Sequence, residues 1–502
     1  MARKTIRSIP QERAPMPVQD AQERARNFEE VSLGLDLDNA LLECDRCLMC
    51  PQPACVDGCP VKIDIPGFIA KMIEKEYRAA YDLLTDSTLL PAVCGRVCPQ
   101  EDQCEGVCAV GVGTNLEPVA IGRLERFLGD MAIAEGWQKK SHIEGNQFRV
   151  AIVGSGPAGM ACAADLAKAG CAVTIYEALH APGGVLRYGI PEFRLPNAVV
   201  DAEIDNLKAL GVEFTCNTLV GRLFTIEQML GDMGYDAVFI GVGAGTPHFM
   251  DIPGENLNGV LSANELLTRC NLMHAGEFPD YDTPLGIGRR VAVIGSGNTA
   301  MDAMRVSMRL GADEVHCVYR RTETECPARR EELHHAQEEG IEFHWLTNPV
   351  ELLGDADNNV RAIRCIRMEL GEPDASGRRR PVPIPGSEFD FKADTVVYAI
   401  GTSPNPILGQ TSNIALNKWG YIDTDEQLAT SLAGVYAGGD IVTGAATVIQ
   451  AMGAGRKAAQ SIRRYLSIRD SGVVYEQEQP GFEGSLFGID LAEQNFNPIR
   501  LT

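Results

Sequence analysis

The chain has 502 residues, of which 45 % are apolar and 23 % charged, and 45 basic against 68 acidic residues give a net charge of −23. This composition excludes global disorder, and the acidic surface makes nucleic acid a poor partner because it repels phosphate. No run of about 18 apolar residues predicts a membrane span, and the charged start of the chain lacks the apolar segment of a secretory signal. We therefore expect a cytoplasmic protein with neither a membrane nor a nucleic-acid partner.

The N-terminal part of the chain is predicted to be a helical domain that carries most of the cysteines. It begins as an exposed arm, followed by a short helix within 21–34, and helical patterns recur at 65–75 and 119–134. Nine of the 16 cysteines lie between Cys44 and Cys108. In a cytoplasmic protein such a cluster favours metal ligation over disulfides.

The spacing of these cysteines is typical of iron–sulfur ligation. Thiolates are soft ligands that suit iron–sulfur clusters. A proline directly after a ligand cysteine is typical of ferredoxins and occurs here twice. Zinc and structural thiols are the alternatives, but zinc prefers paired CxxC knuckles, and only the overlapping Cys44-x2-Cys47-x2-Cys50 has that spacing. Nine cysteines do not match the eight positions of two four-ligand clusters, so some must be spectators. The runs are Cys47-x2-Cys50-x4-Cys55-x3-Cys59-Pro60, Cys98-Pro99 and Cys104-x3-Cys108.

A glycine-rich turn follows a polar linker at 138–147 and an apolar strand at 148–153. An Ala-rich helix and a second strand at 172–176 come next, which is the context that a dinucleotide-binding turn requires. The first glycine permits the tight turn, the second lets the backbone approach a pyrophosphate, and the third lets helix and strand pack closely. Glu177 ends the second strand and is suited to a ribose 2′-hydroxyl. The turn has the sequence Gly154-Ser155-Gly156-Pro157-Ala158-Gly159.

The same pattern returns about 140 residues later as an internal repeat. Alanine takes the third glycine position of this turn, an accepted variant. The next strand, at 314–319, ends in Arg320-Arg321 instead of an acid, and arginine pairs with a 2′-phosphate. The second site therefore favours NADP over NAD, although an exposed arginine pair is often only a solvated loop. A packing turn without a ligand is the alternative for either repeat. The second turn has the sequence Gly295-Ser296-Gly297-Asn298-Thr299-Ala300.

A third element is predicted after a stretch of strands and a polar hairpin at 360–393. The run Gly438-Gly439-Asp440 ends an apolar strand, and its aspartate is a candidate for a ribitol hydroxyl. The helix at 447–463 follows, with an N-terminus that could face a flavin edge. A plain turn at the end of a strand is the alternative interpretation.

Together these motifs resemble the glutamate synthase small-subunit family. That family includes the large subunit of NADH-dependent ferredoxin:NADP oxidoreductase and the N-terminal half of dihydropyrimidine dehydrogenase. The similarity covers about residues 25–465 and rests on the cysteine series, GSGPAG, GGVLRYGIPEFRLP at 183–196, GSGNTAMDAMR, YRR and YAGGD. No CxxC lies near either dinucleotide turn, so a dithiol mechanism is not expected.

The resemblance implies an α/β fold with a helical N-terminal iron–sulfur domain and two Rossmann-like dinucleotide-binding domains, the NADP domain being inserted in the FAD domain. It also implies FAD at the first turn, NADP(H) at the second, and two [4Fe–4S] clusters. The expected domains are 1–145 for the clusters, 146–287 with 394–470 for FAD, 288–393 for NAD(P), and 471–502 as a C-terminal tail.

By motif position, Cys47, Cys50, Cys55 and Cys108 would hold one cluster, and Cys59, Cys98, Cys104 and Glu125 the other. Cys44 and Cys94 would be spectators, although the spacing of Cys44 lets it compete with Cys47. The cofactor-binding candidates are Gly154, Gly156, Pro157, Ala158, Gly159, Glu177, Gly184, Leu186, Arg194, Gly243, Gly295, Ser296, Gly297, Asn298, Thr299, Arg320, Arg321, Gly401, Gly439, Asp440, Thr447 and Val448.

The implied activity is that of an NAD(P)H-dependent flavin iron–sulfur oxidoreductase. Hydride would pass between the nicotinamide and the flavin, and single electrons between the flavin and the clusters. No protein acid or base is required, so no catalytic side chain is predicted. The expected partner is the glutamate synthase large subunit. As an alternative, this chain would be the large subunit of an electron-bifurcating NADH-dependent ferredoxin:NADP oxidoreductase or of a related ferredoxin-linked complex, with a flavin- or ferredoxin-linked subunit as its partner. In another class, the chain would be a non-redox scaffold with degenerate sites.

Overall fold

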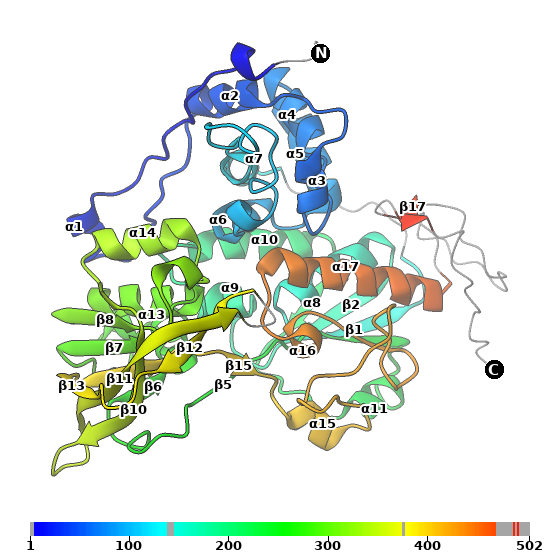
Figure 1. Cartoon of the computed structure of the whole chain (residues 1–502). Coiled ribbons are helices and arrows are strands. Elements are labelled where there is room, and N and C mark those ends of the chain that lie inside the picture. Colours follow the sequence, from blue (N-terminus) through cyan, green and yellow to red (C-terminus); the bar gives the residue numbers. More distant parts are fainter. Residues whose placement is uncertain (1–4, 138–144, 374–376, 468–484, 487–488, 491–502) are drawn as a thin grey trace.

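The computed structural model combines a helical N-terminal part with two units that each contain a parallel sheet (Figure 1). The predicted linker at 138–147 falls mostly outside the described residues. So does the predicted tail at 471–502, apart from β17 (Ser485–Leu486) and β18 (Ile489–Asp490). No helix among the described residues is both long and apolar enough to cross a bilayer. The described residues are 5–137, 145–373, 377–467, 485–486 and 489–490.

Short helices joined by loops form the N-terminal part. Residues next to the helices in the chain cap them. Asp36 accepts a hydrogen bond from the Asn39 N–H at the start of α2, and Asp64 caps α4. The helix predicted within 21–34 is wrong for most of its length. Only Ala21–Arg24 is helical, because the chain then turns back and Val18 pairs with Ser32 in an isolated antiparallel β-bridge. The helices are α1 (Ala21–Arg24), α2 (Leu37–Arg46), α3 (Ala54–Gly58), α4 (Ile65–Ile73), α5 (Tyr77–Ser87), α6 (Pro91–Val97) and α7 (Ile121–Ala134).

The first sheet has the strand order β16-β4-β1-β2-β3, and every pairing in it is parallel. After the exposed Arg149 at the start of β1, its central strands are buried and read as continuous apolar runs, as expected when helices cover both faces. The strands are β1 (Arg149–Val153), β2 (Ala172–Tyr176), β3 (Glu213–Thr215), β4 (Ala237–Ile240) and β16 (Val435–Ala437). The main helices of this unit are α8 (Pro157–Lys168), α9 (Val185–Tyr188), α10 (Asn197–Ala209), α11 (Ile226–Leu230), α16 (Asp440–Thr443) and α17 (Val448–Tyr465).

The second sheet, of order β6-β14-β7-β8-β9, is also parallel. Its position in the chain confirms the predicted insertion, because β16 returns to the first sheet only after the second is complete. However, β6 and β14 lie outside the predicted range 288–393. Their backbone pairing places them with the second unit, whereas the sequence motifs assigned them to the first. The elements are β6 (Val260–Ser262), β7 (Arg290–Ile294), β8 (Glu314–Val318), β9 (Glu342–His344), β14 (Thr395–Tyr398), α12 (Ala263–Leu267), α13 (Asn298–Arg309) and α14 (Arg330–Glu338).

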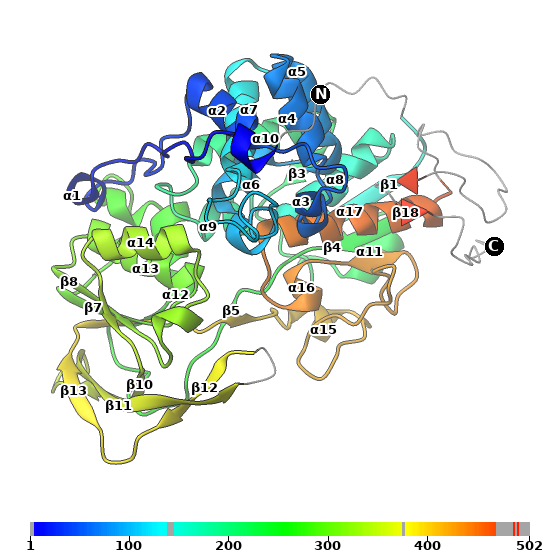
Figure 2. The same cartoon turned by 45° about the horizontal axis from the view of Figure 1, so that its top comes forward.

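A smaller antiparallel sheet extends from the second unit and contains the predicted polar hairpin (Figure 2). A two-stranded ribbon joins the two units, with α15 (Ile407–Thr411) close behind it in the chain. The sheet consists of β10 (Thr347–Gly354), β11 (Val360–Pro373), β12 (Arg379–Pro383) and β13 (Phe389–Lys392), and the ribbon of β5 (Thr246–Pro247) and β15 (Thr402–Ser403).

One buried acid on α10 makes the stability of the protein depend on pH. Glu203 is 4 % exposed, and burial raises its pKa to about 8, from about 4.3 in an unfolded chain. The folded state therefore holds the Glu203 proton more tightly, so the contribution of this group to stability is fully present below about pH 4 and is lost as the pH rises through about 8. Glu203→Gln should raise the melting temperature at pH 8 more than at pH 5.

Differential scanning fluorimetry at both pH values measures this effect. The exposed Glu213 on β3 supplies the matched control, since Glu213→Gln should leave the pH dependence unchanged. Equal shifts for Glu203→Gln at the two pH values would contradict the assignment.

Candidate functional site

The two glycine-rich turns open into one shared cavity of about 550 Å³. A single cavity lets two dinucleotides meet, which two separate clefts would not. Most of the predicted cofactor-binding residues line it: Gly154, Gly156, Pro157, Ala158, Glu177, Gly184, Arg194, Gly243, Gly297, Asn298, Thr299, Gly401, Gly439, Asp440, Thr447 and Val448. Six predicted residues do not: Gly159, Leu186, Gly295, Ser296, Arg320 and Arg321.

The first turn has the backbone that its sequence predicts. Gly154 has φ +101°, and a Cβ there would lie 2.6 Å from the Gly241 carbonyl oxygen, so only glycine fits. A Cβ on Gly156 would meet nothing within 4 Å, which leaves an open cradle where α8 begins. This opening at a helix N-terminus fits the pyrophosphate of FAD.

Glu177 fastens this turn from the end of β2. One carboxylate oxygen accepts hydrogen bonds from the Ser155 N–H at 3.0 Å and from its hydroxyl at 2.5 Å, and the other accepts from the Leu179 N–H at 2.9 Å. Each oxygen can accept more than one hydrogen bond, so a ribose hydroxyl remains compatible with these contacts. The predicted ribose contact stays a prediction.

The third predicted element, Gly438-Gly439-Asp440, also lines the dinucleotide cavity. Asp440 begins α16, and burial raises its pKa to about 6, partly offset by a hydrogen bond from the Ala446 N–H. Thr447 caps α17 in a reciprocal capping box with Gln450. The N-terminus of an 18-residue helix therefore points at the cavity, and its partial positive charge suits an electron-rich ligand.

The arginine pair after β8 divides into two roles. The side chain of Arg321 is buried, and its Nε donates to the Arg379 carbonyl on β12 at 2.8 Å. The preceding Arg320 is exposed at the end of the strand that follows the second turn, which is the position from which a 2′-phosphate is reached. Of the two, only Arg320 is exposed, and its contact with a 2′-phosphate stays a prediction.

We expect Arg320→Ala to raise KM for NADPH about tenfold, because it would remove a charge-assisted hydrogen bond to the 2′-phosphate. KM for NADH should change little. Steady-state kinetics with both nucleotides measures the ratio. Arg321→Ala should instead lower the melting temperature by releasing β12. An unchanged preference for NADPH in Arg320→Ala would refute this assignment.

Arg194 does not behave as a simple cofactor ligand. Its Nη1 donates to both carboxylate oxygens of Asp302 at 2.8 Å, and its Nε lies 3.0 Å from Glu332. Asp302 lies on α13 and Glu332 on α14, so this buried arginine ties the first unit to the second. Its predicted contact with a cofactor stays a prediction.

The predicted cluster ligands gather around two cavities in the helical part. Ile65 and Ile121 line both and form a wall between them. Cys44 and Cys94 line neither, as expected of spectators, and their sulfurs instead contact Met72 and Met452 at 3.8 and 3.6 Å. The first cavity, of about 60 Å³, is lined by Cys47, Cys50, Cys55 and Cys108; the second, narrower at about 10 Å³, is lined by Cys59, Cys98, Cys104 and Glu125.

The thiols and the carboxyl group that line the two cysteine cavities are suited to binding metal ions. Burial, reinforced by the neighbouring thiols of Cys108 and Cys47, raises the pKa of Cys55 to about 12, and burial raises that of Cys59 to about 11. Burial likewise raises the pKa of Glu125 to about 8, and its Oε1 has no hydrogen-bond partner. An unsatisfied buried carboxylate oxygen beside three thiols is costly unless a metal binds them. The donor set therefore fits an iron–sulfur cluster.

The second cysteine cavity and the dinucleotide cavity share a thin wall. Cys98 lines the former, and its two chain neighbours, Val97 and Pro99, line the latter. From the other side, Ile449 of α17 lines the cysteine cavity while Val448 lines the dinucleotide cavity. The motifs gave no reason to select Val97, Pro99 or Ile449, because their role appears only when α6 and α17 meet.

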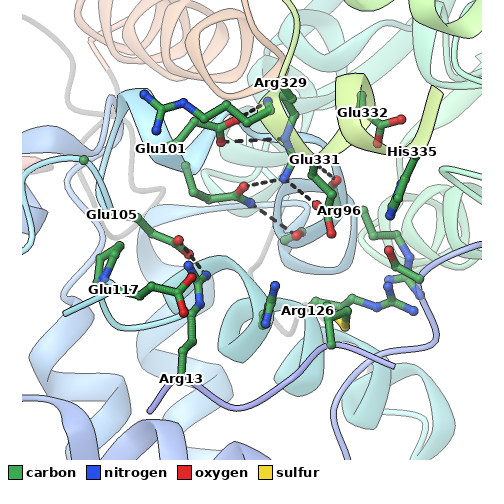
Figure 3. A pocket seen from close by; sticks show the side chains of 18 of the residues that line it. Arg13, Arg96, Glu101, Glu105, Glu117, Arg126, Arg329, Glu331, Glu332 and His335 are labelled. Carbon is green, nitrogen blue, oxygen red and sulfur yellow. Dashed lines mark hydrogen bonds and ion pairs between the residues drawn. The ribbon is translucent and has the colours of Figure 1, made fainter. Parts of the chain in front are cut away.

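A fourth, strongly charged cavity of about 680 Å³ lies between the helical part and α14 (Figure 3). Arg329, just before α14, donates to the Arg96 carbonyl at 2.6 Å and to Gln100 Oε1 at 2.9 Å. Gln100 also lines the second cysteine cavity. The charged contacts of this cavity therefore connect the second unit to the cysteine-rich helices.

Two family models match the chain. The family described as pyridine nucleotide-disulphide oxidoreductase matches residues 148–455, and the one described as dihydropyrimidine dehydrogenase domain II, 4Fe-4S cluster, matches residues 24–137. The first match contains both glycine-rich turns, and the second contains all eight predicted cluster ligands.

Known proteins are similar along most of the chain. The glutamate synthase [NADPH] small chain of Escherichia coli (strain K12) is 36 % identical over 93 % of this chain and 100 % of its own length. The NADP(+)-dependent formate dehydrogenase subunit beta of Moorella thermoacetica is 40 % identical over 82 % of this chain and 60 % of its own length. Among solved structures, Mycobacterium tuberculosis FprA in complex with NADPH aligns with TM-score 0.54 and 23 % identity over 64 % of this chain and 84 % of FprA, which shows a shared fold.

Proposed function

Because the chain belongs to the family of glutamate synthase small chains within the pyridine nucleotide-disulphide oxidoreductases, we propose that it moves electrons between NADP(H) and a partner subunit through two [4Fe–4S] clusters. It is an NADPH-dependent flavin oxidoreductase with a 4Fe–4S domain. Bound FAD would supply the conversion between hydride transfer and single-electron transfer.

The thin wall between two cavities carries this proposal. The Val97-Cys98-Pro99 segment presents its cysteine to one cavity and its two flanking residues to the other. A cluster held by Cys98 would thus lie against the cavity that receives the flavin. This one segment would therefore supply a cluster ligand on one side and part of the wall of the flavin cavity on the other.

The chain's own residues have binding and positioning roles in this reaction. The α8 N-terminus and Gly156 would receive the FAD pyrophosphate, Glu177 its ribose, and Asp440 its ribitol, while the α17 N-terminus would face the flavin edge. Gly297 and Asn298 would receive NADP(H) from the second unit, with Arg320 on the 2′-phosphate. The bound cofactors would supply the hydride chemistry themselves, so no side chain of this chain would have to exchange a proton.

Eight protein ligands would hold the clusters. The first cavity would use four cysteines. The second would use three cysteines and Glu125, whose unpartnered Oε1 is the feature that separates it from an ordinary buried acid. Anaerobic purification followed by flavin, iron and sulfide analysis tests this arrangement, with about eight iron atoms expected per chain. A preparation with zinc and no labile sulfide would overturn it.

The partner we favour is a glutamate synthase large subunit, because the similarity to glutamate synthase small chains spans their entire length. Mixing the chain with such a subunit should produce NADPH oxidation that depends on glutamine and 2-oxoglutarate. A second candidate is a subunit of a ferredoxin- or dehydrogenase-linked complex, favoured by the similarity to the formate dehydrogenase subunit. In that case, co-purification should yield a different partner, and NADPH oxidation should depend on ferredoxin.

A further inference from the structure

Three metal-ligating side chains meet on β8 and β9, outside all four cavities described above. His316 pairs in register with Glu342, and Val318 pairs with His344. Side chains of directly paired residues share a face of the sheet, and so do residues two apart on one strand. His316, Glu342 and His344 therefore converge at the β9 edge of the second sheet.

The distances between their ligand atoms fit one metal ion. His344 Nε2 lies 3.1 Å from His316 Nδ1, and Glu342 Oε2 lies 3.4 Å from the same Nδ1. In a tetrahedral zinc site with bonds of about 2.0–2.1 Å, neighbouring ligand atoms are about 3.3 Å apart. All three ligand atoms lie within 4.8 Å of one another, so little movement would bring them around one ion.

Neighbouring groups hold the imidazoles in this orientation. The ring of Phe391, on β13, stacks on His344 at 5.4 Å with an interplanar angle of 13° and contacts the edge of His316 at 5.9 Å. Glu314 Oε2 lies 3.7 Å from His316 Nε2, the nitrogen that faces away from the other two ligands. A carboxylate on the far nitrogen is the arrangement that orients a metal-bound histidine.

We propose that His316, Glu342 and His344 bind one Zn²⁺ ion, with water completing its coordination. Two imidazole nitrogens and one carboxylate oxygen suit zinc, whereas Mg²⁺ and Ca²⁺ prefer oxygen ligands throughout. The ion would bind β9 to β8 just before the loop that contains Arg320. Its expected effect is to stiffen the β9 edge of the second sheet.

The test uses the anaerobically purified holoenzyme, so that iron and sulfide fill the cysteine cavities. Equilibrium dialysis against ZnSO₄ should load one zinc per chain, and X-ray absorption at the zinc edge should show only nitrogen and oxygen ligands. Glu342→Gln, at an exposed position that leaves the fold intact, and His344→Gln should weaken binding at least ~tenfold. Zinc should also raise the melting temperature of the wild type but not of these variants.

His334→Gln is the matched control, because His334 is an exposed histidine on α14 that also lies near a glutamate. It should bind zinc as the wild type does. Glu314→Gln should weaken binding by about tenfold, as expected for a residue that orients a ligand. No bound zinc, sulfur ligands around it, or unchanged binding in Glu342→Gln and His344→Gln would each overturn the proposal, and none of these results depends on the redox function.

Discussion

Replacing Cys98 with alanine should remove about half of the iron and labile sulfide while leaving FAD in place. Cys98 lines the second cysteine cavity, whereas the first cavity has its own four cysteines and should stay filled. NADPH should still bleach the flavin, but reduction of an acceptor that takes electrons from the clusters should fall to background. Iron and sulfide analysis, EPR of the reduced protein and stopped-flow absorbance measure these three outcomes.

Cys94→Ala provides the matched control. Cys94 is buried in α6, which ends just before Cys98, and it lines neither cysteine cavity; its sulfur contacts Met452 at 3.6 Å and also the Cys98 thiol. Its loss should lower the melting temperature through a small cavity and leave the iron content unchanged. Equal iron loss in both variants would contradict the ligand assignment, and full iron in Cys98→Ala would do so as well.

Gly156→Ala should yield a folded protein that has lost most of its FAD. Gly156 has φ −69°, and a Cβ there meets no protein atom within 4 Å, so the substitution does not strain the fold. The methyl group would instead project into the cavity where the pyrophosphate is proposed to bind. Overpacking of about 1–3 kcal/mol corresponds to a loss of FAD affinity of about five- to 150-fold. Flavin content after dialysis and the far-UV circular dichroism spectrum measure the two effects.

Two other glycines provide the comparisons. Gly286→Ala, at another open position that lies outside the cavity, should keep its FAD. Gly154→Ala should misfold, because its Cβ would lie 2.6 Å from the Gly241 carbonyl oxygen and its φ is positive. A Gly156→Ala protein that retains stoichiometric FAD would show that the pyrophosphate binds elsewhere.

The sequence predicted what depends on short stretches of chain. Both dinucleotide turns follow from glycine spacing, because the need for an αL residue and the close approach of helix and strand are local properties. The predicted cluster ligands line two separate cavities, four to each. The helical prediction for 21–34, which holds only for α1, shows the limit of local patterns, because the β-bridge between Val18 and Ser32 sets the course of the rest of this segment.

Contacts between distant segments could not be predicted in this way. Arg194 pairs with Asp302, more than a hundred positions away, and no periodic pattern relates the two residues. Likewise, the division of labour between Arg320 and Arg321 depends on a carbonyl of β12 that only the folded hairpin provides. The segments containing β6 and β14 were assigned to the wrong sheet for the same reason, because the neighbour of a strand is set by the whole topology.

The late return of β16 to the first sheet constrains how the chain is made. During synthesis β1, β2, β3 and β4 emerge first, but β4 cannot pair with β16 until the whole second unit has left the ribosome. Until then β4 is an unprotected edge of four buried apolar residues, the kind of edge that invites aggregation. The time needed to synthesise the inserted unit should therefore set how long this edge stays unpaired.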